Sequence, residues 1–197
     1  MAGFPAGKKP KLLLHVCCGP CSSAVLERIA AAFEISALFY NPNIAPYEEF
    51  EKRRHEFERL VREIGLSESV HILSCAYEPE KFEEMARGLE ELREGGERCR
   101  RCYELRLREA ARFARQYGCD YFTTTLTISP MKSSAVLNEV GERLAQEYGV
   151  AFLPSDFKKK EGYKRSIVLS KEFGLYRQDY CGCIYSKRQR EQECKEQ

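Results

Sequence analysis

The fold of this chain is decided by the stretch Lys11-Leu12-Leu13-Leu14-His15-Val16-Cys17-Cys18-Gly19-Pro20-Cys21-Ser22-Ser23. Its apolar beginning, bounded by a Gly-Pro turn, predicts a short buried strand over residues 11–16. A helix is expected from Gly19-Pro20 onward, because proline suits the first helical position and serine suits the first turn. Three thiols therefore stand at a strand-to-helix junction, a place where other α/β proteins often hold phosphate.

The rest of the chain alternates between strand-like and helix-like segments. Further strands are predicted over 35–40, 70–74, 121–126 and 150–153, and helices over 47–64, 79–94, from about 99 to 115, and over 133–148. This alternation indicates an α/β fold with an open, mostly parallel five-stranded sheet flanked by helices. We expect residues 1–197 to form one domain, in which the polar, basic and partly helical segment 155–197 closes the active-site edge.

The carboxyl ends of parallel strands meet at one edge of such a sheet, and ligands bind there. The residues expected at this edge are Cys17, Cys18 and Cys21 after the first strand, Asn41 and Asn43 after the second, Ser129 and Lys132 after the fourth, and Asp156 after the fifth. Asp120 precedes its strand instead, so we expect it at the opposite edge in a structural role.

The composition separates several classes of protein. A formal net charge of +2 gives no general attraction to polyanions, so nucleic-acid binding needs a local basic face. Ten cysteines are many for 197 residues, and residues 1–11 lack the apolar core of a secretory signal. This combination favours metal or redox chemistry over a disulfide scaffold and predicts a cytoplasmic location. No stretch of about 18 apolar residues occurs, so no membrane span is expected.

Seven of the cysteines stand at spacings that metal sites use: Cys17-Cys18-x-x-Cys21, Cys99-x-x-Cys102 and Cys181-x-Cys183. One zinc ion or one cubane cluster needs four thiols, so the excess indicates two metal centres or a cluster with a redox pair. We expect the neighbouring Cys17 and Cys18 to point in different directions and not to ligate the same tetrahedral ion. Cys75, Cys119 and Cys194 lack partners at ligand spacing and are interpreted as packing or tail residues.

Two further side chains have more than one interpretation. His15 fits a hydrogen-bonded core histidine that orients the turn, and it also fits a metal ligand or a proton-transfer group. Asp156 fits a hard metal ligand, a general acid or a helix cap. We retain both as catalytic candidates, and Asp156 as a candidate ligand because of its position at the edge.

The motifs together resemble those of the QueH-type epoxyqueuosine reductases, from His15 to Ser186. The resemblance rests on His15-Val-Cys-Cys-Gly-Pro-Cys21, Tyr40-Asn-Pro-Asn-Ile44, Arg98-Cys-x-x-Cys-Tyr103, Thr124-Thr-Leu-x-Ile-Ser-Pro130, Asp156-Phe-Lys, Gly162-Tyr163 and Tyr176-Arg-Gln-x-Tyr-Cys-Gly-Cys183. One such motif alone would be weak, whereas this many in the same order are specific. No motif cysteine departs from the family pattern.

The resemblance implies the last step of queuosine formation, which is reductive removal of the epoxide oxygen from epoxyqueuosine at the wobble position of tRNA. It also implies a [4Fe–4S] cluster beside a mononuclear metal ion, which we interpret as iron, held by cysteines and an aspartate. The implied fold is similar to the HUP group of nucleotide-binding α/β proteins, which includes adenine-nucleotide hydrolases. The Ser- and Gly-rich pyrophosphatase loop of that group is absent, which argues against ATP use.

The resemblance and the thiol chemistry together give a hypothesis for the metal site. The open-site ion would bind the epoxide oxygen, while the cluster would relay electrons from a donor of ferredoxin or flavodoxin type. The candidate ligands are Cys17, Cys18, Cys21, Cys99, Cys102, Cys181, Cys183 and Asp156. Cys99 and Cys102 are the first choice for the cluster, because their clip is tightly spaced, and the division of the other cysteines stays open.

A tRNA substrate also needs a basic and aromatic face beside this edge. Residues 158–165 interleave lysine and arginine with an aromatic ring, which suits phosphates and splayed bases. The candidate substrate and tRNA-binding residues are Asn41, Asn43, Ser129, Lys132, Lys158, Lys159, Lys160, Tyr163, Arg165 and Arg177.

Two other classes of protein compete with this interpretation. A zinc-bearing RNA-binding module would use the same thiols without catalysis, and it would be colourless. A thiol-disulfide oxidoreductase would use Cys99-x-x-Cys102 and would stay active after iron is removed. The second class leaves the other five clustered thiols without a role.

Overall fold

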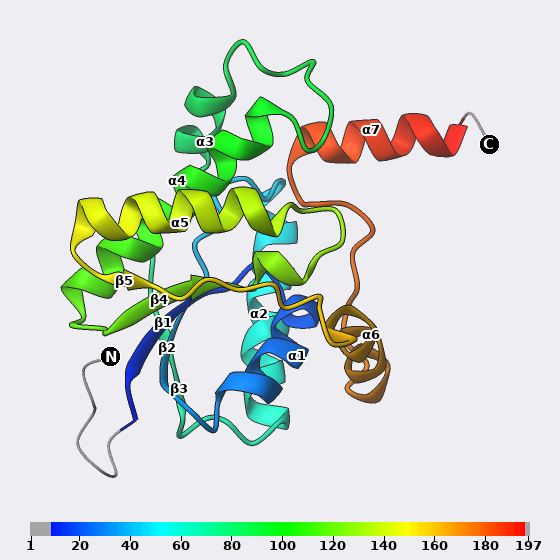
Figure 1. Ribbon diagram of the computed structural model, residues 1–197. Coiled ribbons are helices and arrows are strands. Elements are labelled where there is room, and N and C mark those ends of the chain that lie inside the picture. The colour runs from blue at the N-terminus through cyan, green and yellow to red at the C-terminus, as the bar shows by residue number, and fades with distance from the viewer. Residues whose placement is uncertain (1–8, 196–197) are drawn as a thin grey trace.

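Five strands form one open sheet in the order β3-β2-β1-β4-β5 in this computed structural model, which describes residues 9–195 (Figure 1). The strands are β1 (Lys11–His15), β2 (Glu34–Leu38), β3 (Val70–Leu73), β4 (Tyr121–Thr124) and β5 (Ala151–Phe152). The helices are α1 (Gly19–Ile29), α2 (Tyr47–Glu63), α3 (Pro79–Ala86), α4 (Glu97–Gln116), α5 (Ser134–Tyr148), α6 (Gly162–Glu172) and α7 (Ile184–Lys195). All four strand pairings are parallel, so the predicted α/β fold is confirmed.

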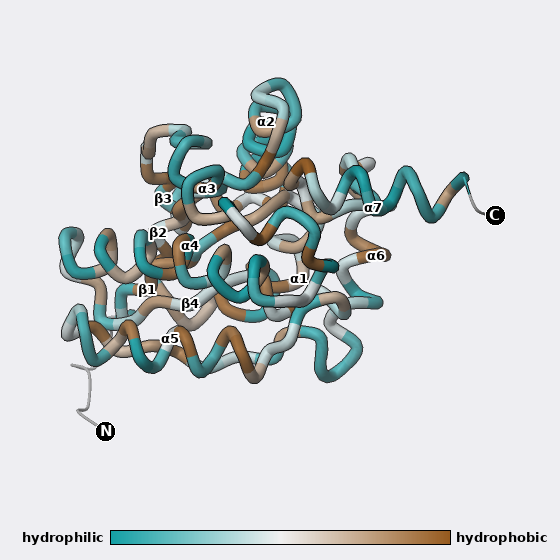
Figure 2. Tube along the Cα trace, turned by 90° about the horizontal axis from the view of Figure 1, so that it is seen from above, coloured by the Kyte–Doolittle hydropathy of each residue, from teal (hydrophilic) through white to brown (hydrophobic). Residues whose placement is uncertain are grey.

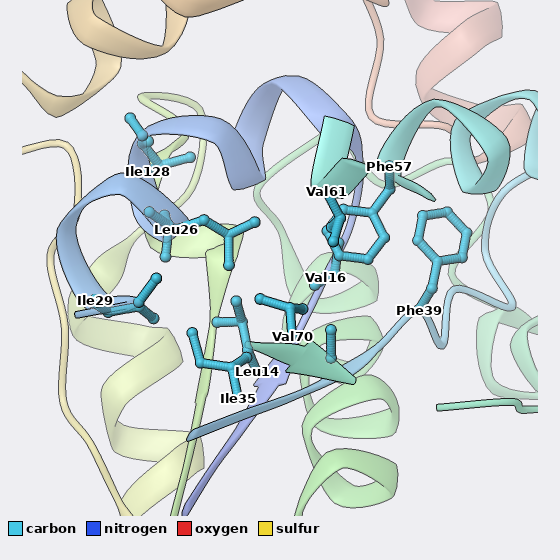
Figure 3. Close-up of a cluster of buried hydrophobic side chains, with 14 of the residues drawn as sticks. Leu14, Val16, Leu26, Ile29, Ile35, Phe39, Phe57, Val61, Val70 and Ile128 are labelled. Atoms are coloured by element: carbon cyan, nitrogen blue, oxygen red, sulfur yellow. The ribbon is translucent and has the colours of Figure 1, made fainter. Parts of the chain in front are cut away.

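The central strand β1 joins two apolar cores, because its side chains alternate between the two faces of the sheet. Leu12 and Leu14 pack with residues of α1 and α2, whereas Leu13 packs with residues of α4 and α5. Figure 3 shows the first core, in which Leu14 and Val16 lie beside Leu26 of α1 and side chains of α2. These side chains are fully buried, so the strand and the turn after it are held from both sides.

The segment after β5 runs past the carboxyl ends of the strands (Figure 1). Its first helix, α6, packs against α1, and its last helix, α7, projects from the body and is mostly hydrophilic (Figure 2). Ser186 is the one fully buried residue of α7. Within residues 9–195 no helix combines the length and the apolar character that crossing a membrane requires.

The helix predicted over 79–94 is wrong in its second half. Helix α3 ends at Ala86, and the chain then makes turns with positive φ at Gly88 and Gly95. The buried Arg98 explains the change, because its Nη1 donates to the carbonyl oxygens of Leu89, Glu90 and Leu92 at 2.9, 2.8 and 2.5 Å. These carbonyls bind a guanidinium in place of the amides that would continue the helix.

The fourth strand ends two residues earlier than predicted, because the hydroxyl of Thr124 accepts a hydrogen bond from the Leu126 amide and begins a 3₁₀ turn (Thr125–Ile128). At the opposite end of this strand, the Asp120 carboxylate accepts a hydrogen bond from the Lys11 amide at 2.8 Å. Asp120 therefore has the structural role at the amino edge that the sequence predicts.

Candidate functional site

A cavity of about 470 Å³ opens at the carboxyl edge of the sheet. Cys17 and Cys21 form its floor on the first turn, and Cys181 reaches it from the loop between α6 and α7. Lys132, from the loop before α5, completes this part of the wall. None of the ten cysteines, all of which lie within residues 9–195, is in a disulfide.

The first group of thiols, which we call the turn thiols, consists of Cys17, Cys18 and Cys21. Their sulfur atoms all lie within 4.8 Å of one another, and those of Cys17 and Cys18 are 3.8 Å apart. The expectation that Cys17 and Cys18 point in different directions is therefore wrong. Cys18 is the N-cap of α1, and its sulfur accepts a hydrogen bond from the Cys21 amide at 3.4 Å, which turns it over the first helical turn. Three convergent thiols can hold a metal ion.

The turn thiols share charge unequally. Hydrogen bonds with the Cys18 and Cys21 thiols hold the pKa of Cys17 well below its usual value, and the Thr125 hydroxyl also donates to its sulfur at 3.4 Å. The same bonds raise the pKa of Cys21, because its proton is needed as a donor. The metal-free turn is thus expected to carry one thiolate, which is the form that binds metal.

The second group, which we call the α4–loop thiols, consists of Cys99, Cys102, Cys181 and Cys183. Cys99 and Cys102 face inward near the start of α4, and Cys102 shares a small apolar cluster with Cys183. Burial raises the pKa of Cys102 to about 12 and that of Cys183 to about 11, and the charge of Cys181 contributes to both. The four thiols therefore lie close enough for their charges to interact, although they come from two segments about 80 residues apart in sequence.

Buried cations surround the sulfur atoms, and sequence reasoning recognised only Lys132 among them. Burial alone would lower the pKa of Lys132, but the negative charges of Cys181, Tyr103 and Cys17 outweigh it and raise the pKa above its usual value. Arg53, on α2, is 2 % exposed and donates to the Cys181 carbonyl at 3.1 Å. Arg106 is equally buried and lines the cavity.

His15 lies in the core beneath the turn. Its Nε2 donates to the Tyr40 carbonyl at 3.0 Å, so its Nδ1 accepts from the Thr124 hydroxyl at 2.9 Å. Burial, reinforced by the charge of Arg106, lowers its pKa to about 3 and keeps the ring neutral. Both nitrogens are engaged inside the protein, as expected for a histidine that orients the turn. Its role in ligation or proton transfer stays a prediction.

Asp156 does not belong to the cavity lining. Its carboxylate pairs with the Lys158 ammonium at 3.0 Å and lies 3.9 Å from that of Lys159. Burial would raise the pKa of Asp156, but the hydrogen bond and charge of Lys158 lower it. The carboxylates that do line the cavity are Glu94, Asp179 and Glu193, all of which sequence reasoning missed. Asp179 precedes Tyr180 and Cys181, so its motif position was the available signal.

The proposed substrate residues divide into two groups. Those that line the cavity with the thiols are Ser129, Lys132, Tyr163 and Arg177. Those outside its lining are Asn41, Asn43, Lys158, Lys159, Lys160 and Arg165. The Arg177 guanidinium lies over the Tyr163 ring at 5.8 Å, Arg165 pairs with Glu27 at 2.6 Å, and Asn41 and Asn43 are almost fully buried.

Lys158, Lys159 and Lys160 form a turn beside the cavity, which we call the lysine turn. Arg28, another residue that sequence reasoning missed, holds this turn in place. Its guanidinium donates to the carbonyl oxygens of Phe157, Lys159 and Lys160 at 3.1, 3.1 and 2.8 Å. Gly162 is needed just after this turn, since a Cβ there would lie 1.9 Å from the Phe157 oxygen. The exposed side chains of Lys159 and Lys160 are therefore presented by a well-braced backbone.

The fold and the site define an α/β protein whose cysteine-rich cavity, at the carboxyl edge of a parallel sheet, can hold metal. A family model described as "Epoxyqueuosine reductase QueH" matches residues 12–189. This chain belongs to that family, and the resemblance seen in the sequence is confirmed.

Three relatives named epoxyqueuosine reductase QueH illustrate the similarity. The protein of Streptococcus pyogenes serotype M1 is 42% identical over 180 residues, which are 90% of this chain and 71% of the relative. That of Staphylococcus epidermidis is 42% identical over 91% of this chain and 77% of its own length. That of Thermotoga maritima is 36% identical over 92% of this chain and 93% of its own length. The family match over residues 12–189 covers both groups of thiols.

The buried His15 is expected to make stability depend on pH. Its pKa is about 3 in the folded protein and 6.5 when unfolded, so below pH 6.5 the unfolded state binds one more proton. The free energy of unfolding should then fall by about 1.4 kcal/mol per pH unit as the pH drops toward 5. Chemical denaturation of the metal-free protein between pH 7 and 5 measures this slope.

His15→Gln should remove this share of the slope, whereas His55→Gln, at an exposed position on α2, should retain it. Equal slopes for the wild type and His15→Gln would contradict the assignment.

Proposed function

We propose that this chain reduces epoxyqueuosine in tRNA to queuosine, the last step in forming that nucleoside. Two electrons and two protons convert the epoxide into an alkene, and its oxygen leaves as water. The observation that carries the proposal is that both groups of thiols reach one cavity, which Cys17, Cys21 and Cys181 line, in a chain that the family model matches over residues 12–189. The electrons would come from a separate donor of ferredoxin or flavodoxin type.

The two groups of thiols support a division of the metal ligands. We assign the four α4–loop thiols to a [4Fe–4S] cluster and the three turn thiols to a mononuclear iron ion. Soft thiolate donors suit both an iron–sulfur cluster and a mononuclear iron ion. When bound, the cluster supplies electrons and the ion supplies a Lewis acid for the epoxide oxygen. Asp156 as a further ligand stays a prediction, since Lys158 already pairs with it.

The cavity also supports binding of a nucleoside. Its volume of about 470 Å³ lies in the range that small-molecule sites occupy. Tyr163 and Arg177 offer a stacked ring and guanidinium on which an unstacked base can lie. Lys132 is 9% exposed and directs a cation into the same space, where it can stabilise the negative charge that develops on the departing oxygen.

Lys132→Met should slow the reaction. Anaerobically reconstituted protein with a chemical reductant should convert epoxyqueuosine tRNA to queuosine tRNA, seen by mass spectrometry of the digested nucleosides as the loss of one oxygen. Removing one preorganised donor to a developing oxyanion typically lowers kcat by about 10²–10³-fold. Lys171→Met, at an exposed position of α6, should leave the rate unchanged. Wild-type protein that loads iron but leaves the epoxide intact would contradict the proposed function.

Metal analysis of cysteine variants tests the division of the thiols. The reconstituted wild type should hold about five irons and about four sulfides per chain. Cys17→Ser/Cys21→Ser should lose about one iron and keep the sulfide, whereas Cys99→Ser/Cys102→Ser should lose the sulfide. Cys194→Ser, at an exposed tail position, is the matched control. Fewer than four irons in the wild type would rule out two centres.

The lysine turn supports contact with tRNA phosphates beside the cavity. Lys159→Ala/Lys160→Ala should weaken tRNA binding. It should also reduce the slope of log affinity against log salt concentration by about 1.5, because binding releases fewer counterions when two phosphate contacts are lost. Lys81→Ala/Lys171→Ala removes equal charge from α3 and α6 and should leave the slope unchanged. An unaltered affinity in the first variant would exclude this face.

The competing classes are not favoured by the family to which the chain belongs. Colour distinguishes the proposed enzyme from a zinc-binding module, because iron–sulfur thiolates absorb broadly near roughly 400 nm and zinc thiolates do not. Removal of iron separates the thiol-disulfide oxidoreductase, whose activity would survive it.

A further inference from the structure

Arg106 lies on the same face of α4 as Cys102, one of the two α4–loop thiols on this helix. It follows Cys102 by four residues, a spacing that places the two side chains one turn apart on one side of the helix. Its side chain is 2% exposed and lines the cavity whose floor is formed by Cys17 and Cys21. The guanidinium therefore borders both groups of thiols.

A buried amide holds this guanidinium in place. Its Nη2 donates to the Asn41 oxygen at 2.5 Å, and the Asn41 amide nitrogen donates to the Val16 carbonyl at 2.9 Å. This chain of hydrogen bonds links Arg106 to the backbone at the entry to the first turn. Asn41 thus has a role that the sequence did not indicate, since both ends of its amide are used inside the protein.

Arg106 has fewer hydrogen bonds within residues 9–195 than the other two buried arginines. Arg53 pairs with the Glu49 carboxylate at 2.6 Å, and Arg98 binds three carbonyl oxygens. Within residues 9–195 neither Arg98 nor Arg106 pairs with a carboxylate, and each has a buried Nε without a hydrogen-bond partner, but the Asn41 oxygen is the one acceptor that Arg106 has. A buried cation without a counter-charge is unfavourable unless an anionic group comes to lie beside it.

We propose that Arg106 is a positioning residue whose guanidinium is the counter-charge of the loaded iron–sulfur site and donates its Nε–H to a sulfur there. This inference rests on the proposed function. The geometry supports it, because Arg106 follows Cys102 by one helical turn and lines the same cavity as Cys17. Hydrogen bonds to cluster sulfurs and nearby positive charge stabilise the reduced, more negative state. Arg106 therefore raises the midpoint reduction potential of the site.

The test is a redox titration of the loaded protein, followed by electron paramagnetic resonance, with iron and sulfide measured on the same samples. Arg106→Gln should load the same iron and sulfide as the wild type and show a more negative midpoint potential. Arg106→Lys keeps the charge but has no donor at the Nε position, so its potential should lie between the two. Arg108→Gln, on the outer face of α4 where Arg108 pairs with Glu104, should match the wild type.

An unchanged potential in loaded Arg106→Gln would overturn the inference. Should Arg106→Gln fail to load, loaded Arg106→Lys decides: a more negative potential supports the inference, and a wild-type potential overturns it. A wild type that shows no iron–sulfur signal would instead contradict the proposed function, before any variant is compared.

Discussion

The hydrogen bond from the Cys21 amide to the Cys18 sulfur is the interaction on which the site depends. It uses a thiol as the N-cap of α1 and so directs three sulfurs toward one point. The turn cannot relax elsewhere, because β1 is packed from both faces and His15 ties its end to neighbouring strands. The chain thus prepares a metal-binding turn where related folds prepare a phosphate-binding one.

The second constraint is charge. Thiols of the two groups that become thiolates would repel one another unless cations lie close to them. Lys132, Arg53 and Arg106 supply those cations from three different elements, whereas the lysines of residues 158–160 lie outside the cavity lining. The basic side chains thus form two groups, an inner one close to the sulfur atoms and an outer one that can contact phosphate. The near-neutral composition conceals this division.

The sequence was sufficient for the number of strands, for their parallel pairing and for the edge at which the turn cysteines lie, because these follow from local patterns and general rules of parallel sheets. It was insufficient where one distant side chain changes a local preference. Arg98 binds the carbonyl oxygens that follow α3, where the pattern predicts that the helix continues, and Asp156 pairs with Lys158 and does not line the cavity. The adjacency of Cys17 and Cys18 in sequence also led to the wrong prediction that their side chains point in different directions. The capping hydrogen bond sets the direction of the Cys18 sulfur.

The buried arginines show what a closer reading of the sequence could recover. Arg106 lies one helical turn after Cys102. If the thiols of Cys99-x-x-Cys102 face inward, Arg106 must face inward too. Arg53 is the one buried residue of the charged run Lys52-Arg53-Arg54-His55 on α2, and it contacts the loop around Cys181. The first could be predicted from helix geometry, whereas the second depends on a contact between segments 128 residues apart.

Diffraction at the iron absorption edge from anaerobically grown crystals tests the central claim most directly. Two separate anomalous peaks are expected, a large one among Cys99, Cys102, Cys181 and Cys183 and a smaller one beside Cys17, Cys18 and Cys21. A single peak shared by both groups, or none at the turn, would contradict the account.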